Sequence, residues 1–254
     1  MVLLDVKNLN RSFGGLRAIR EVSFSLEAGL IKAVIGPNGA GKTTLFNLLT
    51  GNLAADNGTL LFDHQDLSGK PAFLRARAGM ARTFQNIKLF PQMSVLDNVL
   101  VGGHTRTRSG FLSGMLPLPG SVREQKSLCE QAMVLLHRYG LADEKNTLTG
   151  ALSFGQQRSV ELCRALLLKP KLLLLDEPAA GLNMQETAML SESIRYIRSE
   201  RITVLLVEHD MSLVMDICDE ILVLNYGERI AEGKPTDIRR NPDVIKIYLG
   251  DEDA

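Results

Sequence analysis

Short apolar segments separated by glycine-containing turns fill the N-terminal part of the chain. These segments have strand length, and Gly14-Gly15 and Ala28-Gly29 form the predicted turns between them. A segment with helical spacing, Lys42 to Leu49, follows and ends before Gly51. The pattern therefore predicts a helix that is preceded by strands at residues 2–9, 21–26 and 30–35.

The middle of the chain has a helical pattern. Ser94 is a predicted N-cap, with Asp97 three residues later, for a helix that extends through Val101. Residues 102–120 are rich in Ser, Thr, Gly and Arg and predict a long loop or insertion. Apolar residues between positions 128 and 136 predict one more helix, which ends at Gly140.

From residue 154 onward, predicted helices alternate with short apolar strands. This alternation implies an α/β protein with a largely parallel sheet covered on both faces. We expect one domain, in which residues 1–90 and 160–235 form the core, residues 91–159 an inserted helical subdomain, and residues 236–254 a helical tail. Helices are predicted at 154–168, 184–199 and 211–218, and strands at 172–175, 203–207, 221–224 and 228–231.

Composition limits the function classes. Lys and Arg number 29, as do Asp and Glu, and the resulting net charge of +0 argues against a nucleic-acid binder, which would be basic. No apolar run reaches the ~20 residues of a membrane span, and the N-terminus lacks the pattern of a secretory signal. The cysteines, Cys129, Cys163 and Cys218, have no CxxC spacing and are expected to be reduced and buried.

A glycine-rich loop predicts a nucleotide site. Residues 36–43, Gly-Pro-Asn-Gly-Ala-Gly-Lys-Thr, match the P-loop pattern GxxxxGK[ST] between a predicted strand and a predicted helix. Backbone N–H groups of such a loop point at phosphate oxygens beside the positive end of a helix. Lys42 adds a charge at the β- and γ-phosphates, and the Thr43 hydroxyl is a Mg²⁺ ligand. The strand and helix context argues against a chance glycine-rich turn.

Two adjacent acids, Asp176 and Glu177, end the apolar strand that begins at Leu172. In a parallel sheet, ligands bind beyond the carboxyl ends of the strands, so both carboxylates are expected beside the P-loop. We expect Asp176 to hold Mg²⁺ through water and Glu177 to polarise the attacking water. The alternative, a strand that ends in a solvated acidic turn, is weak beside a P-loop.

Further motifs resemble those of ATP-binding cassette (ABC) proteins. Residues 152–158, Leu-Ser-Phe-Gly-Gln-Gln-Arg, resemble the LSGGQ signature and lie between the P-loop and Asp176. Gln85 matches the Q-loop, His209 matches the switch histidine, and Ala180 to Asn183 match the D-loop. The resemblance covers the whole chain.

This resemblance implies an ABC ATPase fold, that is, a P-loop NTPase core with a mixed, largely parallel sheet, an antiparallel β subdomain and an inserted α-helical subdomain. It implies that Phe13 stacks on adenine, and that Gln85 and His209 act with Glu177 in hydrolysis. The implied Mg²⁺ ligands are Thr43, Gln85 and Asp176. The implied ATP-contacting residues are Phe13, Gly36, Pro37, Asn38, Gly39, Ala40, Gly41, Lys42, Thr43, Thr44, Ser153, Gly155 and Gln156.

Two positions depart from the family pattern. Phe154 replaces the first glycine of the signature, but Ser153 and Gly155 remain, so contact with ATP is expected to survive. Asn183 replaces the D-loop aspartate and cannot carry a charge, which leaves open how this site signals to a partner site.

A narrower resemblance concerns residues 82–98, 110–114 and 241–250. They resemble the ATP-binding subunits of bacterial branched-chain amino acid importers, specifically the larger of two paralogous ATPases. This resemblance implies uptake of leucine, isoleucine and valine through two transmembrane permease subunits, with a periplasmic substrate-binding protein. It also implies a head-to-tail dimer with a second ATPase, identical or paralogous, at the cytoplasmic face of the bacterial inner membrane, and no nucleic-acid partner.

Other functions stay open. Similar ATPases serve urea or amide uptake and lipopolysaccharide export. A soluble ABC ATPase generally has coiled-coil insertions or tandem cassettes, and a P-loop kinase would lack the Ser153 signature. Residues 85–93, which include Leu89 and Phe90, predict an apolar groove for a permease helix, although such side chains also cover subdomain junctions.

Overall fold

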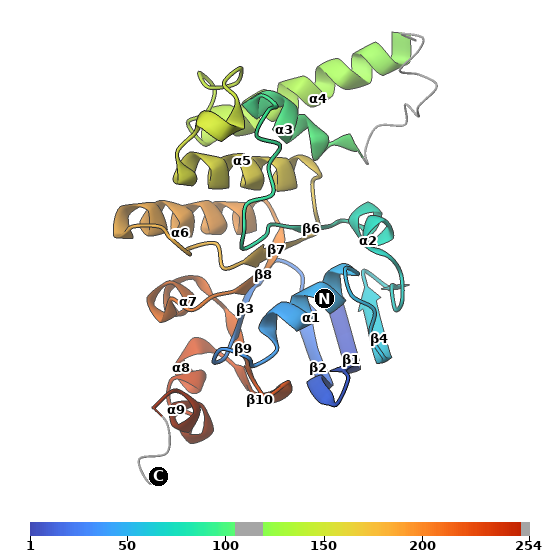
Figure 1. Cartoon of the computed structure of the whole chain (residues 1–254), viewed down its shortest axis with the longest axis vertical. Helices are drawn as coiled ribbons and strands as arrows, with labels where there is room; N and C mark the ends of the chain where they lie inside the picture. Colours follow the sequence, from blue (N-terminus) through green and yellow to red (C-terminus); the bar gives the residue numbers. More distant parts are fainter. Residues whose placement is uncertain (105–118, 250–254) are drawn as a thin grey trace. The chain divides into compact units, whose positions relative to one another are not determined.

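The computed structural model describes residues 1–104 and 119–249 (Figure 1). The chain forms two compact units, the first from Met1–Arg82 with Lys171–Ala254 and the second from Thr83–Pro170. The second unit is longer at both ends than the expected subdomain at 91–159, and the described part of the expected tail, residues 236–249, groups with the core. No helix in the described residues is both long and apolar enough to span a membrane.

Hydrogen bonds explain why the second unit includes residues beyond the expected range of 91–159. The carboxylate of Glu161 accepts from the backbone N–H of Phe84 at 3.3 Å and of Lys88 at 3.4 Å. Arg158 donates in turn to the carbonyl of Phe84, at 2.7 Å. The segment before residue 91 is therefore fixed to helix α5 (Phe154–Leu167), and this helix continues without a break through position 159.

An antiparallel sheet forms one layer of the first unit. Its strands are β1 (Val2–Phe13), β2 (Leu16–Glu27), β4 (Asn57–Phe62) and β5 (Gln65–Asp66), in the order β2-β1-β4-β5. Phe13 pairs with Leu16 across the tight turn at Gly14-Gly15, and Gly14 has a φ of +57°. The predicted turn at this position is confirmed, and Phe13 lies directly before the turn of this long hairpin.

A six-stranded sheet forms the second layer of the same unit. Its order is β10 (Glu228–Gly233), β9 (Glu220–Asn225), β3 (Ile31–Ile35), β8 (Thr203–Val207), β7 (Leu172–Asp176) and β6 (Met80–Arg82). All neighbouring strands are parallel except β10 and β9. The predicted mixed, largely parallel sheet is confirmed, and its parallel strands end at one common edge.

Helices cover both faces of this sheet (Figure 1). Helix α1 (Lys42–Thr50) buries Leu45, Phe46 and Leu49 in a core shared with both sheets. Helices α6 (Met184–Ser199) and α7 (Met211–Ile217) bury Ile194 and Val214 on the other face. The remaining helices of this unit are α2 (Ala72–Ala78), α8 (Pro235–Ile238) and α9 (Pro242–Leu249).

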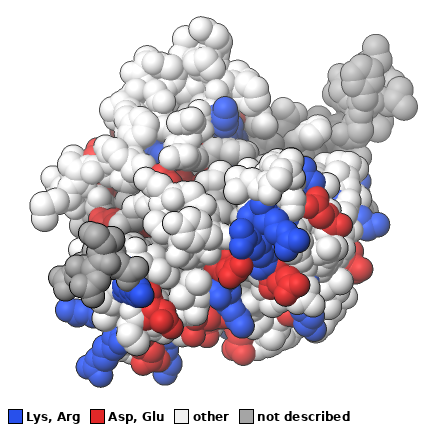
Figure 2. Space-filling view, turned by 60° about the horizontal axis from the view of Figure 1, so that its bottom comes forward, with Lys and Arg blue, Asp and Glu red and all other residues white. Residues whose placement is uncertain are grey.

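One buried cation joins three strands of the first unit. Lys32 in β3 is only 1% exposed, and its ammonium group lies 2.9 Å from Glu220 and 2.5 Å from Glu232. Pairing of this kind offsets the cost of burying a charge. Other acids and bases are intermixed on the face shown in Figure 2, as the net charge of +0 suggests.

The second unit is helical. Helices α3 (Val95–Val101), α4 (Pro119–Arg138) and α5 and the short helix at Thr149–Ala151 enclose a core that includes Val99, Leu136 and Cys163. Ser94 caps α3 as predicted, accepting from the N–H of Asp97 at 3.0 Å. Of the predicted loop at 102–120, residues 105–118 lie outside the described part. Among the cysteines, Cys129 is half-buried rather than buried.

Candidate nucleotide-binding site

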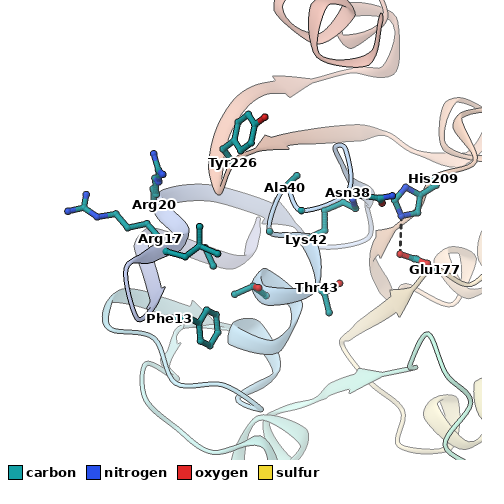
Figure 3. A pocket seen from close by; sticks show the side chains of 15 residues that line it. Phe13, Arg17, Arg20, Asn38, Ala40, Lys42, Thr43, Glu177, His209 and Tyr226 are labelled. Atoms are coloured by element: carbon teal, nitrogen blue, oxygen red, sulfur yellow. Dashed lines mark hydrogen bonds and ion pairs between the residues drawn. The ribbon is translucent and has the colours of Figure 1, made fainter. Parts of the chain in front are cut away.

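A cavity of about 350 Å³ opens at the carboxyl edge of the parallel sheet, in the first unit (Figure 3). This volume lies in the range of small-molecule sites. The hairpin β1–β2, the glycine-rich loop, the ends of β7 and β8 and the β9–β10 turn all contribute to it. The lining residues are Phe13, Leu16, Arg17, Ala18, Arg20, Asn38, Gly39, Ala40, Gly41, Lys42, Thr43, Thr44, Glu177, His209 and Tyr226.

The glycine-rich loop links β3 to α1 in a conformation that requires glycine at two places. Gly36 has a φ of +151°, and a Cβ there would lie 2.1 Å from the carbonyl oxygen of Leu224. Gly41 has a φ of +102°, and a Cβ there would lie 2.7 Å from the carbonyl oxygen of Ala18. Because no side chain caps α1, the N–H groups of its first turn are available to an anionic ligand.

Lys42 lies inside this loop. Its ammonium group donates to the carbonyl oxygens of Gly36 at 2.7 Å and Pro37 at 2.9 Å, and the residue is only 6% exposed. Burial lowers the pKa of Lys42, and the nearby carboxylate of Glu177 raises it in part. A cation is thus held next to an acid within one small cavity, together with the hydroxyls of Thr43 and Thr44.

Glu177 and His209 meet across the ends of two neighbouring strands. Nε2 of His209 lies 2.9 Å from Oε1 of Glu177, as the dashed line in Figure 3 shows. Glu177 has a φ of +48°, an uncommon conformation for a residue with a side chain, which costs of order 1–3 kcal/mol. Strained residues of this kind cluster at functional sites. The structure therefore brings these two predicted residues together with Lys42.

Glu208 positions this pair, and the sequence interpretation overlooked it. Its buried carboxylate accepts from the backbone N–H of Ala179 at 2.7 Å, of His209 at 2.9 Å and of Asp210 at 3.3 Å. It thereby ties the loop after β7 to the loop after β8. An acid that directly follows the apolar run at residues 204–207 is the signal that could have identified it.

Asp176 lies deeper than expected. We predicted both acids beside the P-loop, but only Glu177 lines the cavity. Oδ2 of Asp176 accepts from Nη2 of Arg82 at 2.7 Å, and both side chains are almost fully buried. Nη1 of Arg82 donates to Asn47 at 2.7 Å and to Thr50 at 3.1 Å. Through Arg82, Asp176 is connected to helix α1, the helix that follows the P-loop.

The far end of the cavity is formed by the hairpin and the β9–β10 turn (Figure 3). Phe13 is 46% exposed there, and Tyr226 is 76% exposed. The N–H of Arg20 donates to the carbonyl of Gly227 at 2.8 Å, and the N–H of Gly227 donates to the carbonyl of Ala40 at 3.0 Å. These bonds hold hairpin, turn and P-loop together. The sequence interpretation did not include Arg17, Arg20 or Tyr226, because only the fold brings them here.

The remaining predicted site residues belong to the second unit. Ser153 caps α5, accepting from the N–H of Gln156 at 3.3 Å, and the side-chain oxygen of Gln156 accepts from the N–H of Ser153 at 3.0 Å. Gly155 lies in the first turn of this helix. Gln85 is exposed, and its backbone carbonyl accepts from Arg158 at 2.7 Å. The predicted roles of these residues in ATP contact and hydrolysis stay predictions.

Both departures from the signature and D-loop patterns have a local structural account. Phe154 is 48% exposed, and the guanidinium carbon of Arg158 lies 5.3 Å from the centroid of its ring. A contact of this type is a cation–π interaction. Oδ1 of Asn183 accepts from the N–H groups of Gln185 and Glu186, both at 3.0 Å, and so caps α6. Asparagine caps a helix about as well as aspartate does, so the replacement keeps the cap and removes the charge.

The glycine-rich loop between a buried strand and a helix, with acids at the ends of neighbouring strands, defines a P-loop nucleotide-binding protein. The family model described as "ABC transporter" matches residues 19–180, and "Branched-chain amino acid ATP-binding cassette transporter" matches residues 228–254. The chain therefore belongs to the ABC transporter family, as an ATP-binding and ATP-hydrolysing subunit.

Relatives and solved structures are similar to the chain along nearly its whole length. It is 46% identical to the high-affinity branched-chain amino acid transport ATP-binding protein LivG of Escherichia coli K12 and 44% identical to BraF of Pseudomonas aeruginosa, each over 98% of both chains. A nucleotide-free ATP-binding cassette from an ABC transporter superposes with a TM-score of 0.85 at 32% identity, over 98% of this chain and 100% of that one. The ADP conformation of the cassette MJ1267 gives 0.84, also at 32% identity, over 98% and 99%.

Proposed function

We propose that the chain powers the uptake of the branched-chain amino acids leucine, isoleucine and valine, by binding and hydrolysing ATP for partner permease subunits. The observation that carries the ATPase part is the cavity in which Lys42, Glu177 and His209 converge on the glycine-rich loop. The substrate part is supported by the relatives, which are named for branched-chain amino acid transport and match 98% of the chain.

The cavity suggests how ATP is bound. The base stacks on Phe13 at the hairpin end, and the phosphates lie along the P-loop, where the first N–H groups of α1 have no side-chain cap. The ammonium group of Lys42 moves from the carbonyls of Gly36 and Pro37 to the phosphate oxygens. The cation is already in place, so binding requires only a local exchange of partners.

Glu177 and His209 supply the chemistry of hydrolysis. The carboxylate of Glu177 acts as the general base that orients and deprotonates the attacking water. His209, whose Nε2 lies 2.9 Å from that carboxylate, holds it in position and lines the same cavity, where it would contact the terminal phosphate. Glu208 fixes the backbone of His209, so the geometry of the pair does not depend on a flexible loop.

The residues present fit a magnesium ion bound together with ATP. The described residues contain no cluster of three or more His, Cys, Asp or Glu side chains that could hold a metal by itself. Magnesium in nucleotide sites needs only one or two protein oxygens, because phosphates and water supply the others. The Thr43 hydroxyl, which lines the cavity, offers one such oxygen. Asp176, whose carboxylate is paired with Arg82 outside the cavity lining, would act through a water molecule, and Gln85 is the third predicted ligand. The ion would neutralise phosphate charge during hydrolysis.

We further propose that the chain acts as a peripheral subunit at the cytoplasmic face of the bacterial inner membrane. Its partners would be two permease subunits, a periplasmic substrate-binding protein and a second ATPase, identical or paralogous, in a head-to-tail dimer. In this dimer the capped start of α5, with Ser153, Gly155 and Gln156, would contact the ATP of the partner. Phe90, which is 50% exposed, supports a permease contact along residues 85–93.

A transport assay tests the proposal. The complex, purified with the permeases that co-purify from membranes, is reconstituted in proteoliposomes with ATP enclosed, and uptake of labelled leucine, isoleucine and valine is measured. We expect uptake that competes among the three amino acids and is lost in the Glu177→Gln variant. Uptake of urea or an amide instead, or export of lipopolysaccharide, would overturn the substrate assignment and leave the ATPase assignment intact.

A further inference from the structure

The ring of Phe13, which is proposed above to stack on the base of ATP, is in contact with a cation. The guanidinium carbon of Arg11 lies 4.9 Å from the centroid of the Phe13 ring. Arg11 and Phe13 both belong to β1, whose register is irregular at Arg11, and this contact places their side chains next to each other. Phe13 lines the cavity, whereas Arg11 does not. One face of the ring is thus covered by a cation, and the ring is presented to the cavity.

Asp56, just before β4, fixes this cation. Its Oδ1 lies 2.9 Å from Nη1 of Arg11, and its Oδ2 accepts from the backbone N–H of Ser12 at 2.7 Å. The N–H of Asp56 donates to the carbonyl of Asn10 at 2.9 Å. One carboxylate therefore holds both the Arg11 head group and the backbone between Arg11 and Phe13. The guanidinium is fixed by the carboxylate on one side and by the ring on the other.

We propose that Arg11 and Asp56 are positioning residues that hold the Phe13 ring ready to stack on the base of ATP, an inference that rests on the proposed binding of ATP in this cavity. A half-exposed phenylalanine at a hairpin end would otherwise sample several rotamers. The apparent dissociation constant equals the intrinsic one divided by the fraction of molecules in the competent state. If releasing Arg11 reduces that fraction to between a third and a tenth, the affinity for ATP falls by about 3- to 10-fold.

A purely structural role of the pair makes a different prediction. Arg11 and Asp56 also link β1 to the start of β4, and loss of that link alone would disturb the whole unit, including the P-loop. It would then weaken every phosphate ligand equally. A role in positioning the ring affects only ligands that have a base. Tripolyphosphate, which has the phosphates of ATP and no base, separates the two roles.

The experiment measures binding of ATP and of tripolyphosphate to the full chain by calorimetry, without hydrolysis, for Arg11→Ala and Asp56→Asn. We expect the dissociation constant of ATP to rise about 3- to 10-fold for Arg11→Ala, and less for Asp56→Asn, while that of tripolyphosphate stays unchanged. The KM for ATP should rise equally at constant kcat. Lys7→Ala, which removes an exposed ion pair with Asp5 on the same strand, is the matched control.

Phe13→Ala separates failure of this inference from failure of the proposed site. If Phe13→Ala weakens ATP binding but Arg11→Ala does not, or weakens tripolyphosphate equally, the positioning role is wrong while base stacking stands. If Phe13→Ala leaves ATP affinity unchanged, the proposed stacking itself is wrong. The double variant should bind ATP no more weakly than Phe13→Ala alone, because Arg11 acts only through the ring. Should Arg11→Ala fail to fold, Asp56→Asn gives the same comparison with both Arg11 and Phe13 present.

Discussion

The buried pair of Arg82 and Asp176 allows a quantitative test of the core of the site. In Arg82→Met, the apolar stem of the side chain is kept and the guanidinium is lost. Asp176, whose side chain is 5% exposed, then has no counter-charge at 2.7 Å. Breaking a buried ion pair by removing one partner costs about 3–5 kcal/mol, since the remaining charge is uncompensated. The two hydrogen bonds from Arg82 to Asn47 and Thr50 are lost as well.

For a chain of this size, each kcal/mol lowers the melting temperature by about 2–4 °C, so Arg82→Met should lower it by roughly 6–20 °C. Scanning calorimetry of the full chain measures this shift. The control is Arg195→Met, which breaks a 2.6 Å ion pair with Asp216 in which both side chains are about half exposed. Exposed pairs are worth about 0–1 kcal/mol, so the control should shift the melting temperature by at most about 4 °C.

A double variant tests the cause of the loss. Asp176→Asn removes the charge that Arg82→Met leaves unpaired, so the double variant should be less destabilised than the sum of the two single variants. If Arg82→Met melts within the range of the Arg195→Met control, or if the two single effects simply add, the pair does not contribute as a buried ion pair and the reasoning is refuted.

Three further predictions concern function. Glu177→Gln should bind ATP normally but hydrolyse it roughly 10²–10⁴-fold more slowly, which is the range for a lost general base. Lys42→Ala should instead weaken the binding of ATP. Hydrolysis by Glu177→Gln within a few-fold of wild type would contradict the assignment of Glu177. Ser153→Arg should abolish ATP hydrolysis of the assembled complex, and unchanged hydrolysis would rule out contact with the partner's ATP. Phe90→Asp should uncouple transport while sparing ATP binding, and a cysteine at Leu89 should crosslink to a permease loop; normal transport without crosslinks would place the docking site elsewhere.

The parallel core could be predicted because its strands carry an unambiguous signal. Strands β3, β7 and β8 are buried at every position and consist mainly of apolar residues, with Lys32 as the charged residue inside β3 and Asp176 as the last residue of β7. The predicted runs at 30–35, 172–175 and 203–207 therefore agree closely with the structure. Helix boundaries agree where a cap is encoded, as at Ser94 for α3 and at Gly51 for α1.

The missed elements are short and depend on partners far away in the sequence. Strand β6 has three residues and ends in Arg82, and only its pairing with β7 makes it a strand. Strand β4 contains Gly58 and has exposed or half-buried residues at four of its six positions, so it has little apolar periodicity of its own. Helix α2 lacks a side-chain cap and buries only Arg75. Local patterns cannot identify such segments, because tertiary contacts stabilise them.

Three acids that follow buried strands show where the sequence stops being informative about the site. Asp176, Glu177 and Glu208 give the same signal, a carboxylate at the carboxyl end of an apolar run, and all three lie at the predicted edge of the sheet. Their chemistry nevertheless differs, because it is set by partners that only the fold brings close. Asp176 is neutralised by Arg82, Glu177 meets His209 in the cavity, and Glu208 accepts three backbone N–H groups. An acid bonded to backbone N–H groups is held in place, and an acid paired with a buried arginine is fixed in orientation. Only Glu177 both lines the cavity and contacts a histidine, and it is therefore the one of the three to which we assign proton transfer.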